Sequence, residues 1–232
     1  MKEQSFWNEE AMQIPVCQEL VKNWEQIRDE ALGFLNSFSE DTLGMTIFND
    51  PKVKVPIIKD NKWSENWTLL CNDGLWKAQF IGENGIRQNS GEFGVLNEYY
   101  EKKTIRETSR TILENTIHAR KFFPTFNSII ETYSPNTCSA CNISVVSPGT
   151  KIAPHFGTKG YLRIHLCLVN DQQCTITVGE ETKQWEEGHI LAFKDGGPYP
   201  HSVNHSGSKD RVVIIFDLPI DYVKKYINSE YL

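Results

Sequence analysis

The sequence has no long apolar segment, and this absence limits the classes of protein to which it can belong. Its longest run of aliphatic and aromatic residues is Val212–Phe216, whereas a transmembrane helix needs about 20 apolar residues. The N-terminal stretch MKEQSFWNEE is too polar and too acidic for a signal peptide. We therefore expect a cytoplasmic protein that has no membrane segment.

An excess of positive charge is also missing. The 24 Lys and Arg residues face 30 Asp and Glu residues, so the formal net charge is −6. A chain without a global basic field is not expected to coat nucleic acid or to bind an anionic membrane. Its 232 residues, of which 39% are hydrophobic and 23% charged, are typical of a globular protein and suffice to bury a core in one domain.

Cysteine is too sparse for a disulfide scaffold, because the whole chain contains six. Cys138 and Cys141 form a CSAC pair, but a structural zinc site usually needs a second pair or histidines at zinc-finger spacing. A redox pair would open a helix, whereas residues 142–146, which follow this pair, have the pattern of a strand. The sequence therefore favours two ordinary thiols where a strand begins.

The predicted secondary structure changes in kind near residue 125. Before that point, helical spacing of apolar residues predicts a helix from Leu20 to Leu35. Prolines and polar residues predict irregular structure over 49–67, and a second helix is expected at 98–121. After it, short segments rich in β-branched residues alternate with turn residues. These predicted strands are 127–132, 142–147, 161–169, 174–178, 189–193 and 211–216.

Many short strands separated by turns favour an antiparallel barrel or sandwich. We expect a single domain over 1–232, with a helical and mixed N-terminal support region at 1–120 and a β-core at 121–220. No glycine-rich turn of the Rossmann or P-loop type follows a predicted strand, so a nucleotide-binding fold has no support.

Two of the predicted strands place charged side chains toward an interior. Because side chains alternate along a strand, Arg163, His165 and Cys167 share one face of 161–169, and the leucines and isoleucine between them share the other. Arg211 begins a strand that is apolar on both faces, which indicates burial on both faces. A buried arginine needs an anion, because its unpaired charge is costly to desolvate. The alternative is that both arginines reach solvent at strand ends or pair with Asp and Glu.

The six histidines divide into two groups. We expect His118 and His189 to be ordinary surface or hydrogen-bonded residues. His155 and His201 each follow a proline where a loop meets a strand, and the intervening strands can bring them together at the mouth of a barrel. Two neutral imidazoles with open positions suit a divalent first-row metal. With the two arginines and His165 nearby, such a cavity would hold a metal and a dianion together.

These motifs resemble the aspartyl/asparaginyl β-hydroxylase family. The similar segments are SVVSPGTKIAPHFG at 144–157, YLRIHL at 161–166 and WEEG at 185–188, followed by Phe193, His201 and Arg211. The resemblance covers roughly 120–218 and, more weakly, 76–80. It implies a mainly β fold with flanking helices and a double-stranded β-helix, or jelly-roll, core. It also implies an oxygenase that uses iron(II), with 2-oxoglutarate and O2 as cosubstrates.

The resemblance assigns roles to six positions. It implies that His155 and His201 bind the metal, that Ser144 and Arg211 hold the distal carboxylate of 2-oxoglutarate, and that Arg163 and His165 lie near its oxalyl end. We expect the catalytic residues to be the two histidines and Arg163. The implied reaction hydroxylates an unactivated C–H bond, at the β-carbon of an Asp- or Asn-type amino acid or residue, and releases succinate and CO2.

Position 157 leaves the chemistry open. Most members of the wider superfamily carry an Asp or Glu two residues after the first metal histidine, whereas this chain has Gly157. The resembled family shares this absence and is thought to place water there, but related halogenases use Gly or Ala with chloride in the gap. A halogenase, or a non-catalytic barrel that binds a dicarboxylate or a metal, therefore remains an alternative.

Departures from the family leave the substrate open as well. The stretch 155–163 is one residue shorter, the loop 194–200 is about two longer, and 98–121 resembles an insertion. We do not expect the tetratricopeptide-like region and the membrane anchor that the animal enzymes of this family carry before the catalytic core. The acceptor is therefore expected to be a free amino acid, a peptide or a carrier-bound amino acid, with a lipid acyl chain as a further variant. Three residues that flank the second metal histidine are expected to be ordinary loop residues rather than substrate contacts: Asp195, Tyr199 and His205. The sequence does not indicate an oligomeric state.

Overall fold

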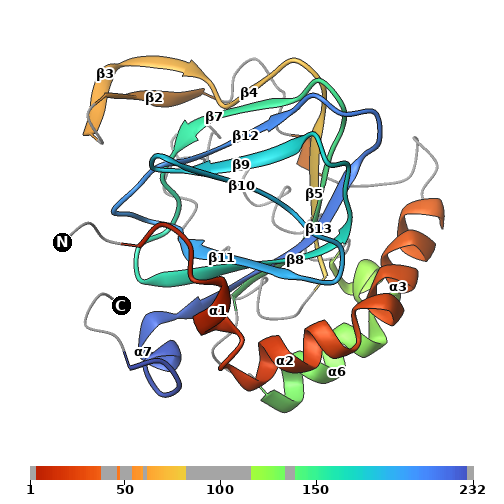
Figure 1. Ribbon diagram of the computed structural model, residues 1–232. Helices are drawn as coiled ribbons and strands as arrows, with labels where there is room; N and C mark the ends of the chain where they lie inside the picture. The colour runs from red at the N-terminus through yellow and green to blue at the C-terminus, as the bar shows by residue number, and fades with distance from the viewer. Residues whose placement is uncertain are drawn as a thin grey trace, which may run out of the picture.

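Two antiparallel sheets face each other, and a separate two-stranded sheet projects from them (Figure 1). The computed structural model describes residues 4–37, 46–47, 54–59, 62–81, 116–133 and 139–228. The six-stranded sheet has the order β1 (Thr46–Ile47), β5 (Trp76–Phe80), β6 (Ser139–Val146), β13 (Arg211–Pro219), β8 (Tyr161–Val169) and β11 (Ile190–Lys194). The five-stranded sheet has the order β10 (Glu181–Gln184), β9 (Cys174–Val178), β12 (His201–His205), β7 (Lys151–His155) and β4 (Cys71–Asn72). The protein is therefore mainly β with a jelly-roll core and flanking helices, which confirms the predicted fold class.

Helices cover the outer face of the six-stranded sheet (Figure 1). They are α2 (Pro15–Lys22), α3 (Trp24–Ser37) and α6 (Pro124–Tyr133), while the short helices α1 (Asn8–Ala11) and α7 (Ile220–Val223) lie near the termini. The even-numbered residues of β8 pack into the apolar cluster that includes Ile27 and Phe34 of α3. Cys167 belongs to a second cluster between the two sheets, together with Val213 and Ile215 of β13. The predicted alternation of β8 and the two-sided burial of β13 are both confirmed.

The prediction of a strand at 127–132 is wrong, because this segment belongs to α6. Its β-branched content suggested a strand, but Phe126, Ile129 and Ile130 are buried at helical spacing. A carboxylate from another helix also favours the helix: Glu30 of α3 accepts a hydrogen bond from the backbone N–H of Thr125, at 2.8 Å. A contact between segments so far apart in sequence cannot be predicted from the local pattern of residues.

Two further expectations about the first half of the chain need correction. The segment 49–67, predicted to be irregular, contains most of a hairpin of β2 (Lys54–Lys59) and β3 (Lys62–Leu69). Pro56 is tolerated because, among the strands that the structure describes, β2 and β3 pair only with each other, and the register shifts beside it. The helix predicted from Leu20 to Leu35 is two helices that meet at Asn23. The expected helix at 98–121 lies mostly outside the described residues, of which 116–120 are helical.

The sheets extend beyond the region to which the sequence assigns the β-core. Strands β1, β4 and β5 all precede residue 121 and nevertheless join the two main sheets. Three strands within the core, β7, β10 and β12, were not predicted, because they are short and rich in polar residues or proline. The family resemblance, rather than the strand pattern, therefore carries the jelly-roll prediction.

The N-terminal segment lies along β11, which is the last strand of the six-stranded sheet. The backbone N–H of Trp7 donates to the carbonyl oxygen of Ala192 at 2.8 Å, and the N–H of Ala192 donates to Oδ1 of Asn8 at 2.8 Å. Phe6 is buried in the cluster between the sheets. This segment therefore continues the hydrogen bonding of the sheet past its last strand.

Two expectations concern cysteines and membranes. Cys141 is buried within β6, as expected of a structural thiol, while Cys138 lies outside the described residues. In the part of the chain that the structure describes, no helix is long and apolar enough to cross a membrane.

Candidate functional site

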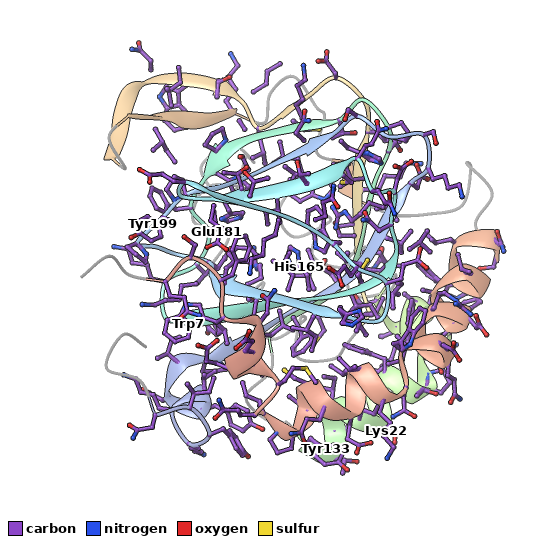
Figure 2. The ribbon with its side chains drawn as sticks, in the orientation of Figure 1. Trp7, Lys22, Tyr133, His165, Glu181 and Tyr199 are labelled. Carbon is purple, nitrogen blue, oxygen red and sulfur yellow. The ribbon has the colours of Figure 1, made fainter. Side chains whose placement is uncertain are left out.

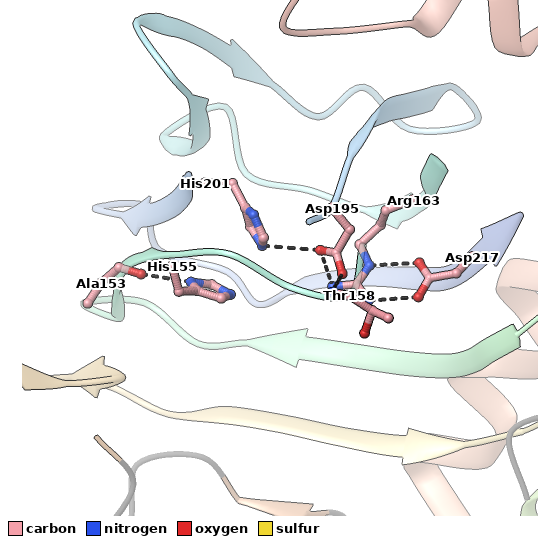
Figure 3. Close-up of polar contacts among 7 residues, drawn as sticks. All are labelled: Ala153, His155, Thr158, Arg163, Asp195, His201 and Asp217. Carbon is pink, nitrogen blue, oxygen red and sulfur yellow. Dashed lines mark hydrogen bonds and ion pairs between the residues drawn. The ribbon is translucent and has the colours of Figure 1, made fainter. Parts of the chain in front are cut away.

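His155 and His201 lie side by side between the two sheets. They are register partners in the adjacent strands β7 and β12, and their ring centroids are 4.1 Å apart. The structure thus brings together the two histidines that the sequence paired. Nδ1 of His155 lies 2.8 Å from the carbonyl oxygen of Ala153 (Figure 3). Because a carbonyl can only accept, this contact places the proton on Nδ1 and leaves Nε2 available as a ligand.

Burial keeps both rings neutral, which is the form that binds a metal. It lowers the pKa of His155 to about 4 and the pKa of His201 well below its usual range. Nδ1 of His201 is buried and has no hydrogen-bond partner. The pair therefore offers the unprotonated nitrogens that a divalent first-row ion needs. Among the described residues, no group of three or more His, Cys, Asp or Glu side chains is placed to hold a metal, so the site provides two histidines.

Asp195 is the acidic residue closest to this pair in the described site. The sequence predicts an ordinary loop residue here, but the carboxylate is completely buried, and its Oδ1 lies 3.6 Å from Nε2 of His201. Its Oδ2 accepts a hydrogen bond of 2.7 Å from the backbone N–H of Thr158 (Figure 3). Burial raises the pKa of Asp195 to about 7, and the positive charge of Arg163 opposes that rise.

The other two loop candidates have contacts of their own. The Tyr199 ring packs against Gly179. His205 is buried at the far end of β12, where its Nε2 donates to the carbonyl oxygen of Lys209 at 2.7 Å and its Nδ1 accepts from the N–H of Gly207. His205 therefore holds a loop in place, as the sequence predicted for an ordinary loop residue.

The position of Asp195 explains why residue 157 is glycine. A Cβ atom at Gly157 would lie 1.8 Å from Oδ2 of Asp195. No carboxylate at position 157 can therefore coexist with Asp195 in its present place. The space that a side chain at position 157 would occupy, two residues after His155, is taken by an acid from another loop.

We predict that Gly157→Ala destabilises the protein by about 1–3 kcal/mol, the usual cost of overpacking a buried site. Gly33→Ala is the matched control, because nothing lies within 4 Å of the Cβ that it adds in α3; it is expected to stabilise by about 0.5–1 kcal/mol. In the Asp195→Gly background, where the clashing carboxylate is gone, Gly157→Ala should cost little relative to Asp195→Gly alone. Urea denaturation of these variants checks the values, and equal stability of Gly157→Ala and Gly33→Ala would contradict the steric interpretation.

Arg163 is neutralised by two carboxylates rather than exposed. Its Nε and Nη2 each donate to one oxygen of Asp217 at 2.8 Å, and its Nη1 lies 2.7 Å from Oδ1 of Asp195 (Figure 3). Of the alternatives that the sequence left open, pairing with acids therefore holds for Arg163. The resemblance places this residue near the oxalyl end of 2-oxoglutarate, yet each of its three nitrogens already contacts a carboxylate. Its direct effect in this geometry is to hold Asp195 next to His201.

Arg211 has a different environment, although it is equally buried. It is 2% exposed, and its guanidinium carbon lies 4.7 Å from the centre of the Trp185 ring. Its Nε and Nη1 are buried without a hydrogen-bond partner, and no ion pair with it is found among the described residues. Burial lowers its pKa. A buried cation with two unused donors points to an anionic ligand.

His165 and Ser144 face the same interior as Arg211. Nε2 of His165 is buried without a partner, while its Nδ1 accepts a hydrogen bond of 3.3 Å from Trp185. Figure 2 shows His165 between the two sheets. The hydroxyl oxygen of Ser144 accepts a hydrogen bond of 3.0 Å from Trp76, and Ser144 pairs with Val213, two residues along β13 from Arg211. The interior between the sheets thus carries several buried polar groups on one face of the six-stranded sheet.

Aromatic contacts connect these buried polar residues to the histidine pair. The Phe193 ring centroid lies 4.8 Å from that of His201 and 5.3 Å from that of His165. The His165 and Trp185 rings are stacked at 6.0 Å. Ring contacts therefore link His201 to Arg211 through Phe193, His165 and Trp185. The residues present fit a metal and a dicarboxylate held together.

Two acids in the site were missed at the sequence level. Asp217 carried a usable signal, because it lies on the same face of β13 as Arg211 and is the register partner of Arg163. The sequence around Asp195 contains no comparable signal, because this residue lies in a loop whose path depends on the whole fold.

Comparison with known proteins gives a consistent assignment. The family model described as aspartyl/asparaginyl beta-hydroxylase matches residues 21–219. The mouse aspartyl/asparaginyl beta-hydroxylase is 32% identical over 163 residues, which cover 66% of this chain and 20% of the mouse protein. Mouse aspartate beta-hydroxylase domain-containing protein 2 is 43% identical over 84 residues, 34% of this chain and 24% of that protein.

A solved structure described as a predicted oxalate decarboxylase from Thermotoga maritima aligns over 38% of this chain and 73% of that one, with 15% identity and a TM-score of 0.32. A likeness at that level carries no argument about function. The chain spans about a fifth of the length of the mouse hydroxylase that it matches. Because the family model matches most of the sequence, the chain belongs to the aspartyl/asparaginyl β-hydroxylase family.

Proposed function

We propose that the protein is an iron(II)- and 2-oxoglutarate-dependent hydroxylase. Its acceptor would be an unactivated C–H bond, at the β-carbon of an Asp- or Asn-type amino acid or residue, with release of succinate and CO2. One observation supports this most directly: a pair of neutral histidines shares a buried interior with an arginine that has two unused donors. Family membership supports hydroxylation as the reaction type.

Each residue of the site would have a defined task. His155 and His201 would hold the iron, Arg211 and Ser144 the distal carboxylate, and His165 would donate to the oxalyl end. Iron(II) and 2-oxoglutarate would supply the oxidising chemistry from O2, while the protein binds, orients and excludes water. Arg163 would act through Asp195, whose carboxylate it fixes beside His201.

The position of Asp195 favours hydroxylation over halogenation. In a halogenase, chloride would occupy the space next to residue 157, but here the Asp195 carboxylate fills that space. An anion placed there would be repelled by this buried acid, whereas a water molecule would find a hydrogen-bond acceptor. The product mass measured with and without chloride tests this, and a chloride-dependent product would reverse the assignment.

We predict that anaerobic addition of iron(II) and 2-oxoglutarate gives a visible charge-transfer band that His201→Ala abolishes. The substitution removes one of the two protein ligands, so the metal would lose its site. His189→Ala is the control, because His189 is exposed and lies outside the site; it should keep the band. Absorption spectra of the wild-type protein and of the two folded variants, recorded with iron(II) and 2-oxoglutarate, test this prediction.

The absence of a band in the wild-type protein with ample iron would overturn the oxygenase proposal. A non-catalytic barrel that binds a dicarboxylate would then be favoured. Consumption of 2-oxoglutarate that depends on iron, measured as succinate, separates the two functions, because a binding protein would not turn over the cosubstrate.

A further inference from the structure

The side chain of Asp195 presents an unused hydrogen-bond acceptor next to the histidine pair. Its Oδ1 is buried and lies 2.7 Å from Nη1 of Arg163, an ion pair without hydrogen-bond geometry, so among the described residues this oxygen has no hydrogen-bond partner. The same oxygen lies 3.6 Å from Nε2 of His201, whereas Oδ2 already accepts from the backbone N–H of Thr158. A buried acceptor without a donor is costly, so Oδ1 points to a ligand group that carries an N–H or an O–H.

The charges around this oxygen leave no positive charge for a ligand. Asp217 accepts from both Nε and Nη2 of Arg163, at 2.8 Å each, and by itself balances the charge of the guanidinium. Asp195, which is completely buried, adds one negative charge when it is ionised and none when it is protonated. The cluster of Arg163, Asp195 and Asp217 is therefore neutral or negative in either state.

The proposed reaction brings the side-chain group of the acceptor to this cluster. The β-carbon to be hydroxylated must lie against the metal that His155 and His201 would hold, and the side-chain carbonyl carbon is bonded directly to it. That group therefore comes within reach of Asp195, which lies beside His201. A carboxylate there could only accept hydrogen bonds and would find no net positive charge, whereas the N–H groups of a carboxamide can donate to Oδ1.

We propose that Asp195 is a specificity-determining residue that selects an Asn-type, carboxamide acceptor over an Asp-type, carboxylate acceptor. The inference rests on the proposed function, because it places the acceptor beside a metal bound by His155 and His201. Arg163 and Asp217 contribute by holding the Asp195 carboxylate in place and by leaving the cluster without positive charge.

Binding of paired probes tests this proposal without turnover. The probes are L-asparagine against L-aspartate, and two short alanine peptides, blocked at both ends, that differ only in a central Asn or Asp. Calorimetry without oxygen, on wild-type protein loaded with manganese(II) and 2-oxoglutarate, should show at least about tenfold tighter binding of the Asn probe, because an uncompensated like charge strongly weakens a complex. Equal affinity, tighter binding of the Asp probes, or binding of neither pair would overturn the inference. Failure to bind 2-oxoglutarate would instead overturn the proposed function, so the two failures are distinguishable.

Two substitutions link the preference to the charge of the cluster. Asp195→Asn keeps an oxygen acceptor but removes the negative charge, so it should lower the ratio of the two affinities toward one. Adding Asp217→Asn leaves Arg163 unbalanced and should reverse the preference in favour of the Asp probes. Asp29→Asn is the matched control, because Asp29 forms an exposed ion pair with Arg28 in α3, and it should keep the wild-type ratio.

The ratio of affinities separates specificity from damage to the fold, because a partly unfolded variant loses both probes of a pair equally. A wild-type ratio in Asp195→Asn would overturn the role of Asp195. Where that variant does not fold, Asp217→Asn alone decides, since it removes one negative charge from the same cluster and should also lower the ratio.

Discussion

Arg211→Met is expected to lose 2-oxoglutarate binding while the protein remains as stable as the wild type or becomes more stable. The guanidinium is buried, and its Nε and Nη1 have no partner. Losing one partner of a buried charged contact typically costs a complex about 2–5 kcal/mol, so affinity should fall by at least about thirtyfold. The folded protein, in contrast, no longer contains an unpaired buried charge. Replacing such a charge with a well-packed apolar side chain is often stabilising.

Two measurements test the predicted loss of 2-oxoglutarate binding and the predicted retention or gain of stability. Calorimetry gives the affinity, and guanidinium chloride denaturation without ligand gives the free energy of unfolding. A ligand that binds only the folded state raises its stability, so 2-oxoglutarate should raise the Tm of the wild-type protein and leave that of Arg211→Met unchanged. Wild-type affinity in this variant would remove Arg211 from the binding site.

Arg163→Met is expected to have the reverse effect on stability and to lower the free energy of unfolding by about 3–5 kcal/mol. Its removal leaves the buried carboxylates of Asp195 and Asp217 without the cation that pairs with both. Denaturation at pH 7 measures the loss. Arg28→Met is the control, because Arg28 forms an exposed ion pair with Asp29, and such a pair contributes about 1 kcal/mol or less.

The deficit of Arg163→Met should also depend on pH. Burial already raises the pKa of Asp195 in the folded wild type to about 7, and Arg163 opposes that rise, so its removal raises this pKa further. A carboxyl whose pKa is higher in the folded state than in the unfolded state binds more protons when folded, and stability then falls as pH rises. The variant should therefore be closest to the wild type near pH 5 and furthest from it near pH 8. A deficit that is constant over this range would mean that ionisation of Asp195 does not contribute to it.

The sequence predicts much of this site because its strands are regular. Alternation along β8 places Arg163, His165 and Cys167 on the inner face, and the same rule applied to β13 turns Arg211 inward. These strands are long and buried, so their pattern depends little on their neighbours. The same rule, carried two residues past Ile215, also identifies Asp217 as inward.

Other parts depend on contacts that no local pattern contains. α6 has the composition of a strand, yet it forms a helix that Glu30 caps from 95 residues away in sequence. Asp195 reaches His201 only because the loop after β11 folds back over Gly157. The surroundings of each arginine, two acids at Arg163 and an aromatic ring at Arg211, likewise depend on the pairing of distant strands, which residue type alone does not specify.

The N-terminal segment has a consequence for how the protein behaves in concentrated solution. An uncovered last strand presents unpaired backbone groups to any other chain, and natural sheets usually protect such strands. Here Trp7 and Asn8 occupy the hydrogen-bonding groups of Ala192 in β11. The backbone groups of Ala192 are therefore already paired, so a strand of another chain could pair with β11 at this residue only by displacing the N-terminal segment.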